Sequence, residues 1–109
     1  MSFNGNEGSK ISLAEGAALT LRYRIGNQDG VLGAFYGRNH IEEILAQSDC
    51  QGIRIYLGKD VDGKSSLVLV GADSAENDLL DVILDVGQRC PPNCSGTNPL
   101  NADLKGGLK

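Results

Sequence analysis

The segment with the most chemical potential is Cys90-Pro91-Pro92-Asn93-Cys94, which places two cysteines four positions apart. Three intervening residues fall within the spacing of cysteine pairs in structural zinc sites. Cys50 and His40, the only histidine, would complete a set of three thiolates and one imidazole. No second cysteine pair exists, so zinc, the only cofactor that the sequence suggests, is not the favoured interpretation.

Two other states of this segment stay open. A Cys90–Cys94 disulfide is one alternative, whereas the Cys-x-x-Cys spacing of thioredoxin-type redox sites is absent. The favoured interpretation is reduced thiols, with Pro91-Pro92 shaping a rigid loop. An odd number of cysteines, three, fits poorly with a secreted disulfide framework. Residues 1–10 also contain no apolar signal-peptide core, so we expect a cytoplasmic protein.

Gly37-Arg38-Asn39 is the candidate ligand site, because it precedes a predicted helix. Free N–H groups at a helix start, a flexible glycine and a guanidinium together suit a phosphate or carboxylate. A nucleotide is one such ligand, although the spacing of a P-loop is absent. The simpler interpretation, which we favour, is a capped helix with an exposed arginine.

The best-defined element is a β-hairpin between Gly52 and Ala72, with Asp60-Val61-Asp62-Gly63 as its turn. Asp60 at the first turn position and Gly63 at the fourth predict a type I turn closed by a glycine bulge. In that register one face is purely aliphatic, whereas a two-residue turn would mix the faces. The aliphatic face contains Ile53, Ile55, Leu57, Leu67 and Leu69.

The other hairpin face is the candidate interface, and it carries Arg54, Tyr56, Val68 and Val70. Two short helices can cover only one face, so these side chains would stay exposed unless another element covers them. Tyrosine and arginine are typical interface anchors, and a two-fold axis lets one surface serve both copies. We therefore expect a homo-oligomer, with a dimer favoured; the alternative is that residues 90–100 fold back over this face.

The surrounding pattern predicts an α+β fold, with two N-terminal helices packed on one face of a small antiparallel sheet of about three strands. Ser12 and Glu15 form a capping box for a helix from Leu13 to about Ile25. Its core stripe would be Leu13, Ala17, Leu21 and Ile25. A second helix would span 40–47, capped by Asn39 and burying Ile41, Ile44 and Leu45. Residues 79–86 fit a third strand better than a helix, with Leu80, Val82, Leu84 and Val86 on one face.

Size and composition limit the remaining possibilities. The 109 residues predict one domain over 11–100, between flexible segments 1–10 and 101–109. A net charge of −4 and five aromatic residues argue against a nucleic-acid partner. No apolar run is long enough to cross a membrane. No catalytic residue constellation is present, so a non-enzymatic role is favoured.

Four segments together resemble a group of small uncharacterised bacterial proteins of about 100 residues. They are residues 12–15, the GIRIY run at 52–56, residues 67–71 and the CPPNC run at 90–94. The resemblance implies a free-standing bacterial protein and carries no activity or site residue with it. The expected function is a small binding or accessory protein that self-associates. An anionic-ligand sensor using Arg38 and a zinc- or thiol-dependent protein are the two alternatives.

Overall fold

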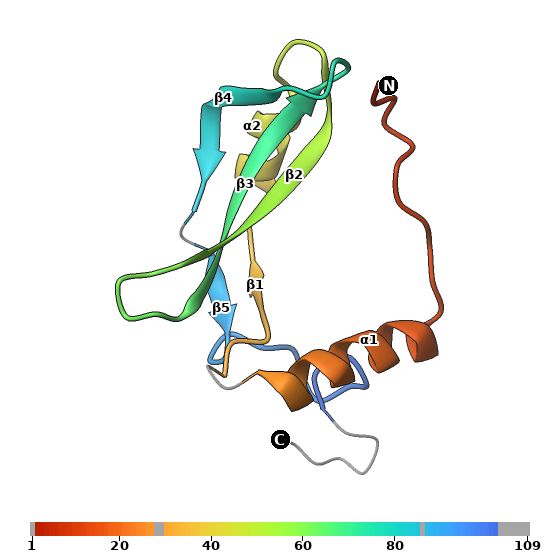
Figure 1. Cartoon of the computed structure of the whole chain (residues 1–109), viewed down its shortest axis with the longest axis vertical. Helices are drawn as coiled ribbons and strands as arrows, with labels where there is room; N and C mark the ends of the chain where they lie inside the picture. The colour runs from red at the N-terminus through yellow and green to blue at the C-terminus, as the bar shows by residue number, and fades with distance from the viewer. Residues whose placement is uncertain (1, 28–29, 86, 103–109) are drawn as a thin grey trace. The chain divides into compact units, whose positions relative to one another are not determined.

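The computed structural model describes residues 2–27, 30–85 and 87–102 (Figure 1). Over these residues the fold is α+β, as predicted, but it has two sheets. The first is the antiparallel sheet β2-β3-β4, and the second consists of β1 and β5. In chain order the elements are α1 (Leu13–Gly26), β1 (Gly33–Phe35), α2 (Arg38–Leu45), β2 (Cys50–Lys59), β3 (Ser65–Asp73), β4 (Asp78–Leu84) and β5 (Gln88–Cys90).

The chain divides into two compact units, each assembled from separate stretches. The first unit combines Met1–Gly8 with Phe35–Gln88 and therefore contains α2 and the three-stranded sheet. The second combines Ser9–Ala34 with Arg89–Lys109 and contains α1 and the Cys90–Cys94 segment. The domain limits expected from the sequence stay predictions, as does the packing of α1 on the sheet.

The hairpin of β2 and β3 has the register predicted from its turn. Leu57 lies opposite Leu67 and Tyr56 opposite Val68. Gly63 has a φ of +83°, the left-handed conformation that a glycine bulge requires. The turn is closed at both ends, because the Asp60 N–H donates to the Lys64 carbonyl at 2.9 Å and the Gly63 N–H donates to the Asp60 carbonyl at 3.0 Å.

Helix α2 covers one end of the aliphatic face. The Ile44 side chain is 0% exposed, and its Cγ2 lies 3.1 Å from where a Cβ on Gly71 would stand. Leu69, next along this face, is 5% exposed. An eight-residue helix is only about 12 Å long, whereas ten strand residues span about 33 Å. The helix is therefore too short to cover the whole strand.

Helices packed on the aliphatic face would bury Ile55 and Leu69 as a cross-strand pair, and this expectation holds for Leu69 but is wrong for Ile55. On the half of β2 nearest the turn, Leu57 is 87% exposed and Ile55 is 55% exposed. Both lie on the aliphatic face, opposite Leu67 and Leu69. The prediction that Leu45 is buried is also wrong, because this side chain is 46% exposed at the end of α2.

Strand β4 confirms the prediction that residues 79–84 are extended, but their side chains do not alternate regularly between the two faces of the sheet. Gly71 pairs with Leu79, whereas the neighbouring Val70 pairs with Ile83. Residues 80–82 therefore bulge out of the ladder, which shifts the facing residues. As a result Leu79, and not Leu80, shares a face with Leu84; Leu80 is 68% exposed. Val86 lies outside the described residues.

Helix α1 begins with the predicted capping box, in which Ser12 Oγ accepts from the Glu15 N–H at 3.0 Å. It ends at Gly26, with Asn27 as its C-cap. The predicted core stripe is not buried within the second unit, since Leu13 is 58% exposed and Ile25 is 71% exposed. The buried position is Gly16, whose missing Cβ would lie 3.2 Å from Leu100 Cδ2. A small residue is needed here because the C-terminal segment packs directly against the helix backbone.

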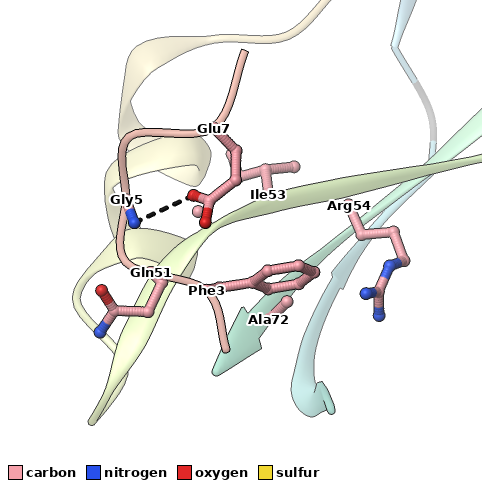
Figure 2. A pocket seen from close by; sticks show the side chains of 8 residues that line it. Phe3, Gly5, Glu7, Gln51, Ile53, Arg54 and Ala72 are labelled. Atoms are coloured by element: carbon pink, nitrogen blue, oxygen red, sulfur yellow. Dashed lines mark hydrogen bonds between the residues drawn. The ribbon is translucent and has the colours of Figure 1, made fainter. Parts of the chain in front are cut away.

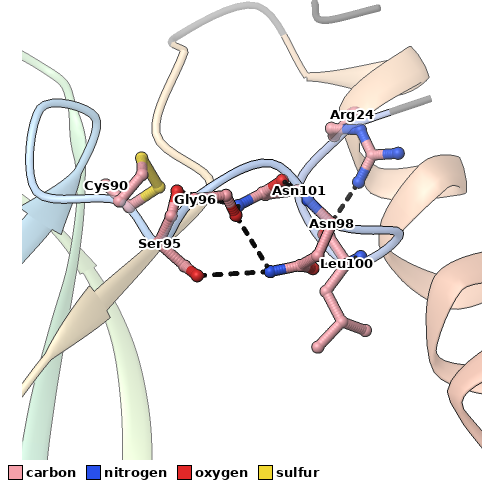
Figure 3. Close-up of a disulfide and its surroundings, with 8 residues drawn as sticks. Arg24, Cys90, Ser95, Gly96, Asn98, Leu100 and Asn101 are labelled. Carbon is pink, nitrogen blue, oxygen red and sulfur yellow. Dashed lines mark hydrogen bonds between the residues drawn. A yellow bond between two sulfur atoms is a disulfide. The ribbon is translucent and has the colours of Figure 1, made fainter. Parts of the chain in front are cut away.

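A polar network orders this C-terminal segment within the second unit (Figure 3). Arg24 Nη1 donates to the Leu100 carbonyl at 2.9 Å. The Asn98 side-chain amide donates to the Gly96 carbonyl at 3.2 Å and to Ser95 Oγ at 3.3 Å. Thus residues 95–101, although rich in turn formers, have a defined conformation alongside α1. Among the described residues, no helix is long and apolar enough to cross a membrane.

Candidate functional site

The candidate interface face carries a cluster of three polar side chains that spans the sheet. Arg54 and Tyr56 project from β2, and Asp78 begins β4 on the other side of β3. Arg54 Nη1 contacts Asp78 Oδ1, and the Tyr56 hydroxyl donates to Asp78 Oδ2 at 2.6 Å. Each carboxylate oxygen therefore has its own donor, and the two long side chains cross over β3 to reach them.

This arrangement corrects one part of the interface prediction. Val70 lies opposite Arg54 in the ladder and is only 2% exposed. Ala72, opposite Asp78, is 3% exposed. Long polar side chains cover apolar neighbours with their carbon stems, so the β3 residues of this face are shielded within one chain. Val68 is half-buried, and Tyr56 retains 46% exposure.

The N-terminal segment adds a second cover that the sequence did not predict. The Phe3 N–H donates to the Ser74 carbonyl at 3.0 Å, and the Phe3 ring stands 5.5 Å from the Arg54 guanidinium carbon (Figure 2). An arginine over an aromatic ring is held by a cation–π interaction. Phe3 is the one aromatic residue among residues 1–10. This single aromatic was the available signal that the segment could pack on the sheet.

A hollow of about 270 Å³ lies between this N-terminal segment and the sheet. Phe3, Gln51, Arg54 and Ala72 contribute to its walls. The Glu7 carboxylate also lines it and accepts from the Gly5 N–H at 3.0 Å, as Figure 2 shows. Since Glu7 stabilises its own loop and Arg54 contacts Asp78, the charged groups of the hollow are already used in holding the segment together.

The cluster shifts the pKa values of its members in opposite directions. The hydrogen bond from Tyr56 is the main cause that lowers the pKa of Asp78, and Arg54 adds to it. The same hydrogen bond raises the pKa of Tyr56, because losing the phenol proton would place two negative charges together. The Asp78 carboxylate likewise raises the pKa of Arg54. The cluster is therefore most stable in the pH range where Asp78 is ionised and Tyr56 is still protonated.

A titration can test this cluster. We expect the Tyr56 phenol to titrate above about 10, the ordinary tyrosine value, and Asp78→Asn to move the midpoint down toward it. The tyrosinate absorbance of each protein, minus that of its own Tyr56→Phe version, isolates this one group. An unchanged midpoint in Asp78→Asn would show that the carboxylate does not hold the phenol proton.

The thermal stability should follow the same linkage. Because the folded-state pKa of Asp78 is lowered, its contribution is present above about pH 3.9 and is lost as the pH falls through the folded value. The raised pKa of Tyr56 has the opposite sign, so its contribution is lost as the pH rises through its folded value. Melting curves of wild type and Asp78→Asn should therefore differ at pH 7 and converge below about pH 3.9.

The exposed side of β2 is the second surface feature. This strand is at one edge of the sheet β2-β3-β4. Its consecutive residues Ile55, Tyr56 and Leu57 are 55%, 46% and 87% exposed. Long edge strands with exposed apolar side chains offer both hydrogen-bonding groups and dry contact area to another strand. We refer to Ile55, Tyr56 and Leu57 as the β2 strip.

The structure places the predicted ligand site at the start of α2. Gly37 is the N-cap, its neighbour Arg38 begins the helix, and both are exposed. Asn39 is therefore not the cap, and within the described part of the chain no side chain makes the capping hydrogen bond. The prediction placed the helix start two residues too late because it relied on a capping side chain. The ligand itself stays a prediction.

The cysteine chemistry differs from the favoured interpretation. Cys90 and Cys94 form a disulfide, whereas Cys50 is the free cysteine. Cys50 Sγ donates to the Gly52 carbonyl at 3.3 Å, and His40 Nδ1 lies 3.4 Å from Glu43 Oε1. Within the described residues, no group of three His, Cys, Asp or Glu side chains lies close enough to hold a metal ion. The predicted set of His40, Cys50, Cys90 and Cys94 is thus not assembled.

The disulfide predicts how many cysteines can be alkylated, which mass spectrometry can count. Of the three cysteines, one per chain should react with iodoacetamide in denaturant before reduction, and all three after it. A Cys50→Ser version should give none before reduction, which identifies the reactive thiol. Complete alkylation of the unreduced protein would contradict the disulfide.

Comparison with known proteins identifies no relative. No protein-family model, no curated protein and no solved structure matches this chain. The functional argument therefore depends on the residues alone.

Proposed function

We propose that this protein is a small non-enzymatic binding or accessory protein that self-associates through its three-stranded sheet. The observation that supports the proposal is the β2 strip, where Leu57 is 87% exposed on an edge strand. An apolar side chain at such an edge favours association, because pairing satisfies the backbone and removes apolar surface from water. The proposed contact therefore lies at the edge of the sheet, beside the face predicted from the sequence. Of the four predicted interface residues, Tyr56 is the one that also belongs to the β2 strip.

A second copy is the favoured partner because the β2 strip suits an isologous contact. In such a contact the same surface of both subunits meets across a two-fold axis, so one exposed strip serves both partners. Arg54 and Lys59 are the charged residues of β2, and Arg54 is already paired with Asp78. The remaining edge is mainly apolar, which favours an uncharged strand as its partner.

One pair of substitutions tests this function. Leu57→Glu should convert the dimer to a monomer, because it places a charge in the contact while leaving the buried residues unchanged. Val61→Glu is the matched control: Val61 is 102% exposed in the hairpin turn, outside β2. We expect light scattering to give about twice the chain mass of 11.5 kDa for wild type and Val61→Glu, and 11.5 kDa for Leu57→Glu. A dimeric Leu57→Glu protein with an unchanged circular dichroism spectrum would contradict the proposal.

The alternatives stay predictions. The anionic-ligand hypothesis depends on Arg38 at a helix N-terminus, and no second observation favours it. The disulfide counts against the zinc hypothesis, because two of the four ligands are bonded to each other. It also counts against the expected cytoplasmic location, since disulfides persist mainly in oxidising compartments. The resemblance to small bacterial proteins likewise stays a prediction.

A further inference from the structure

We infer that two copies join β2 to β2 in one particular register, antiparallel about a two-fold axis, with Tyr56 facing Tyr56 of the partner subunit. The inference depends on the proposed self-association and adds its geometry. The product would be a continuous sheet in the order β4-β3-β2-β2-β3-β4. Four steps lead to this register: the backbone direction, the symmetry, the exposed area and the charges.

The backbone direction follows from the hairpin turn. The Asp60 N–H donates to the Lys64 carbonyl, so the hydrogen-bonding groups of Asp60 point toward β3. The ladder is regular from Lys59–Ser65 back to Gly52–Ala72. Because these groups alternate along an antiparallel strand, the odd-numbered residues direct theirs to the free edge. They are Ile53, Ile55, Leu57 and Lys59.

Symmetry restricts how two such edges can meet. A two-fold axis perpendicular to the sheet keeps each face on its own side, so aliphatic side chains of one copy lie beside aliphatic side chains of the other. The axis must then pass through one residue position that faces itself. Near the β2 strip the available centres are Arg54, Ile55, Tyr56 and Leu57.

The exposed side chains distinguish among these centres. With Tyr56 at the centre, Ile55 lies opposite Leu57 of the partner subunit, and the whole β2 strip pairs with itself. With Ile55 at the centre, Leu57 would lie opposite Ile53, which is already half-buried. With Leu57 at the centre, Ile55 would lie opposite Lys59. The Tyr56 centre therefore buries the most exposed apolar surface.

The charges agree with this choice. An Arg54 centre would place two guanidinium groups directly opposite each other, which is unfavourable. With Tyr56 at the centre, Arg54 lies opposite Gly58, whose lack of a side chain leaves room for it. Lys59 lies opposite Ile53, so no like charges face each other. In this register, the outward groups of Ile53, Ile55, Leu57 and Lys59 would form about eight backbone hydrogen bonds with the partner.

Single-cysteine variants can determine the register. In each register, the residue at the centre faces the same residue of the partner subunit, so a cysteine there can form a disulfide between the two copies. Ile55→Cys, Tyr56→Cys and Leu57→Cys therefore each detect a different register. All three variants also carry Cys50→Ser, which removes the free thiol. Facing residues of a non-hydrogen-bonded pair have Cα atoms about 4.5 Å apart, within the range of a disulfide, about 4.4–6.8 Å. We expect mild oxidation with copper phenanthroline to cross-link most Tyr56→Cys chains and few chains of the other two variants.

Tyr56→Cys removes the hydrogen bond to Asp78, so a second experiment keeps Tyr56 in place and mixes two other cysteine variants. Equimolar Ile55→Cys and Leu57→Cys chains should cross-link to each other several times more than either does alone. Self-cross-linking of Ile55→Cys or Leu57→Cys above that of the mixture would overturn the register while leaving self-association intact. Absence of cross-linking in a dimeric protein would overturn β2 pairing altogether, and a monomeric wild type would overturn the proposed function itself.

Discussion

Ile44→Ala should lower the free energy of unfolding by about 2–5 kcal/mol, because it opens a cavity at a fully buried position. Ile44 is the largest fully buried side chain among the described residues. Its Cγ2 packs beside Gly71, where Cys50 Sγ also lies close to the missing Cβ. Gly71 cannot move far to fill the cavity, since it belongs to the central strand β3. Urea denaturation followed by circular dichroism measures the change.

Leu45→Ala is the control for this prediction. Leu45 follows Ile44 in α2, has the same side-chain volume and is 46% exposed. Its truncation leaves no cavity, so we expect a loss of less than about 1 kcal/mol. Equal losses in the two variants would contradict the orientation of α2 on the sheet.

Leu69→Ala should cost a similar amount, about 2–5 kcal/mol, for a different reason. Leu69 is 5% exposed in the central strand and has Ile55 on one side and Leu84 on the other. Truncating it removes contacts with both neighbouring strands. The matched control is Ile55→Ala, on the same face of the sheet but 55% exposed.

The comparison of these two variants tests how far α2 covers the aliphatic face. We expect Ile55→Ala to cost clearly less than Leu69→Ala under conditions where the protein is monomeric. If the chain dimerises through β2, the cost of Ile55→Ala should grow with protein concentration, because part of its burial then comes from the partner. A large cost for Ile55→Ala at all concentrations would mean that another segment of the same chain covers it.

The hairpin could be predicted because its information is local. Asp60 and Gly63 determine the turn, the turn determines the register, and the register determines which residues share a face. The capping box of α1 was predictable for the same reason, since Ser12 and Glu15 are three residues apart. In each case a few neighbouring residues contain the whole signal.

The candidate site was harder to predict, because it depends on residues far apart in the chain. Arg54 and Asp78 are 24 positions apart, and the strands between them determine whether they meet. Phe3 reaches the same face from the N-terminus, so its contact with Arg54 could not be inferred from the hairpin. The bulge in β4 was also hidden, because an alternating apolar pattern does not reveal three unpaired residues.

The cysteines show the limit of spacing as evidence. Cys90 and Cys94 are spaced suitably for a metal pair, a disulfide or two free thiols, and the sequence left all three open. The structure joins the two sulfurs to each other. Their relation to Cys50 and His40, which belong to the other compact unit, could not be read from the sequence.

The central claim, self-association through β2, is tested most directly by the molar mass of the unmodified chain in solution. Size-exclusion chromatography with light scattering should be run from low to high micromolar concentration. We predict a mass that rises to about twice 11.5 kDa as the concentration increases. A mass that stays at 11.5 kDa at high micromolar concentration would contradict the claim.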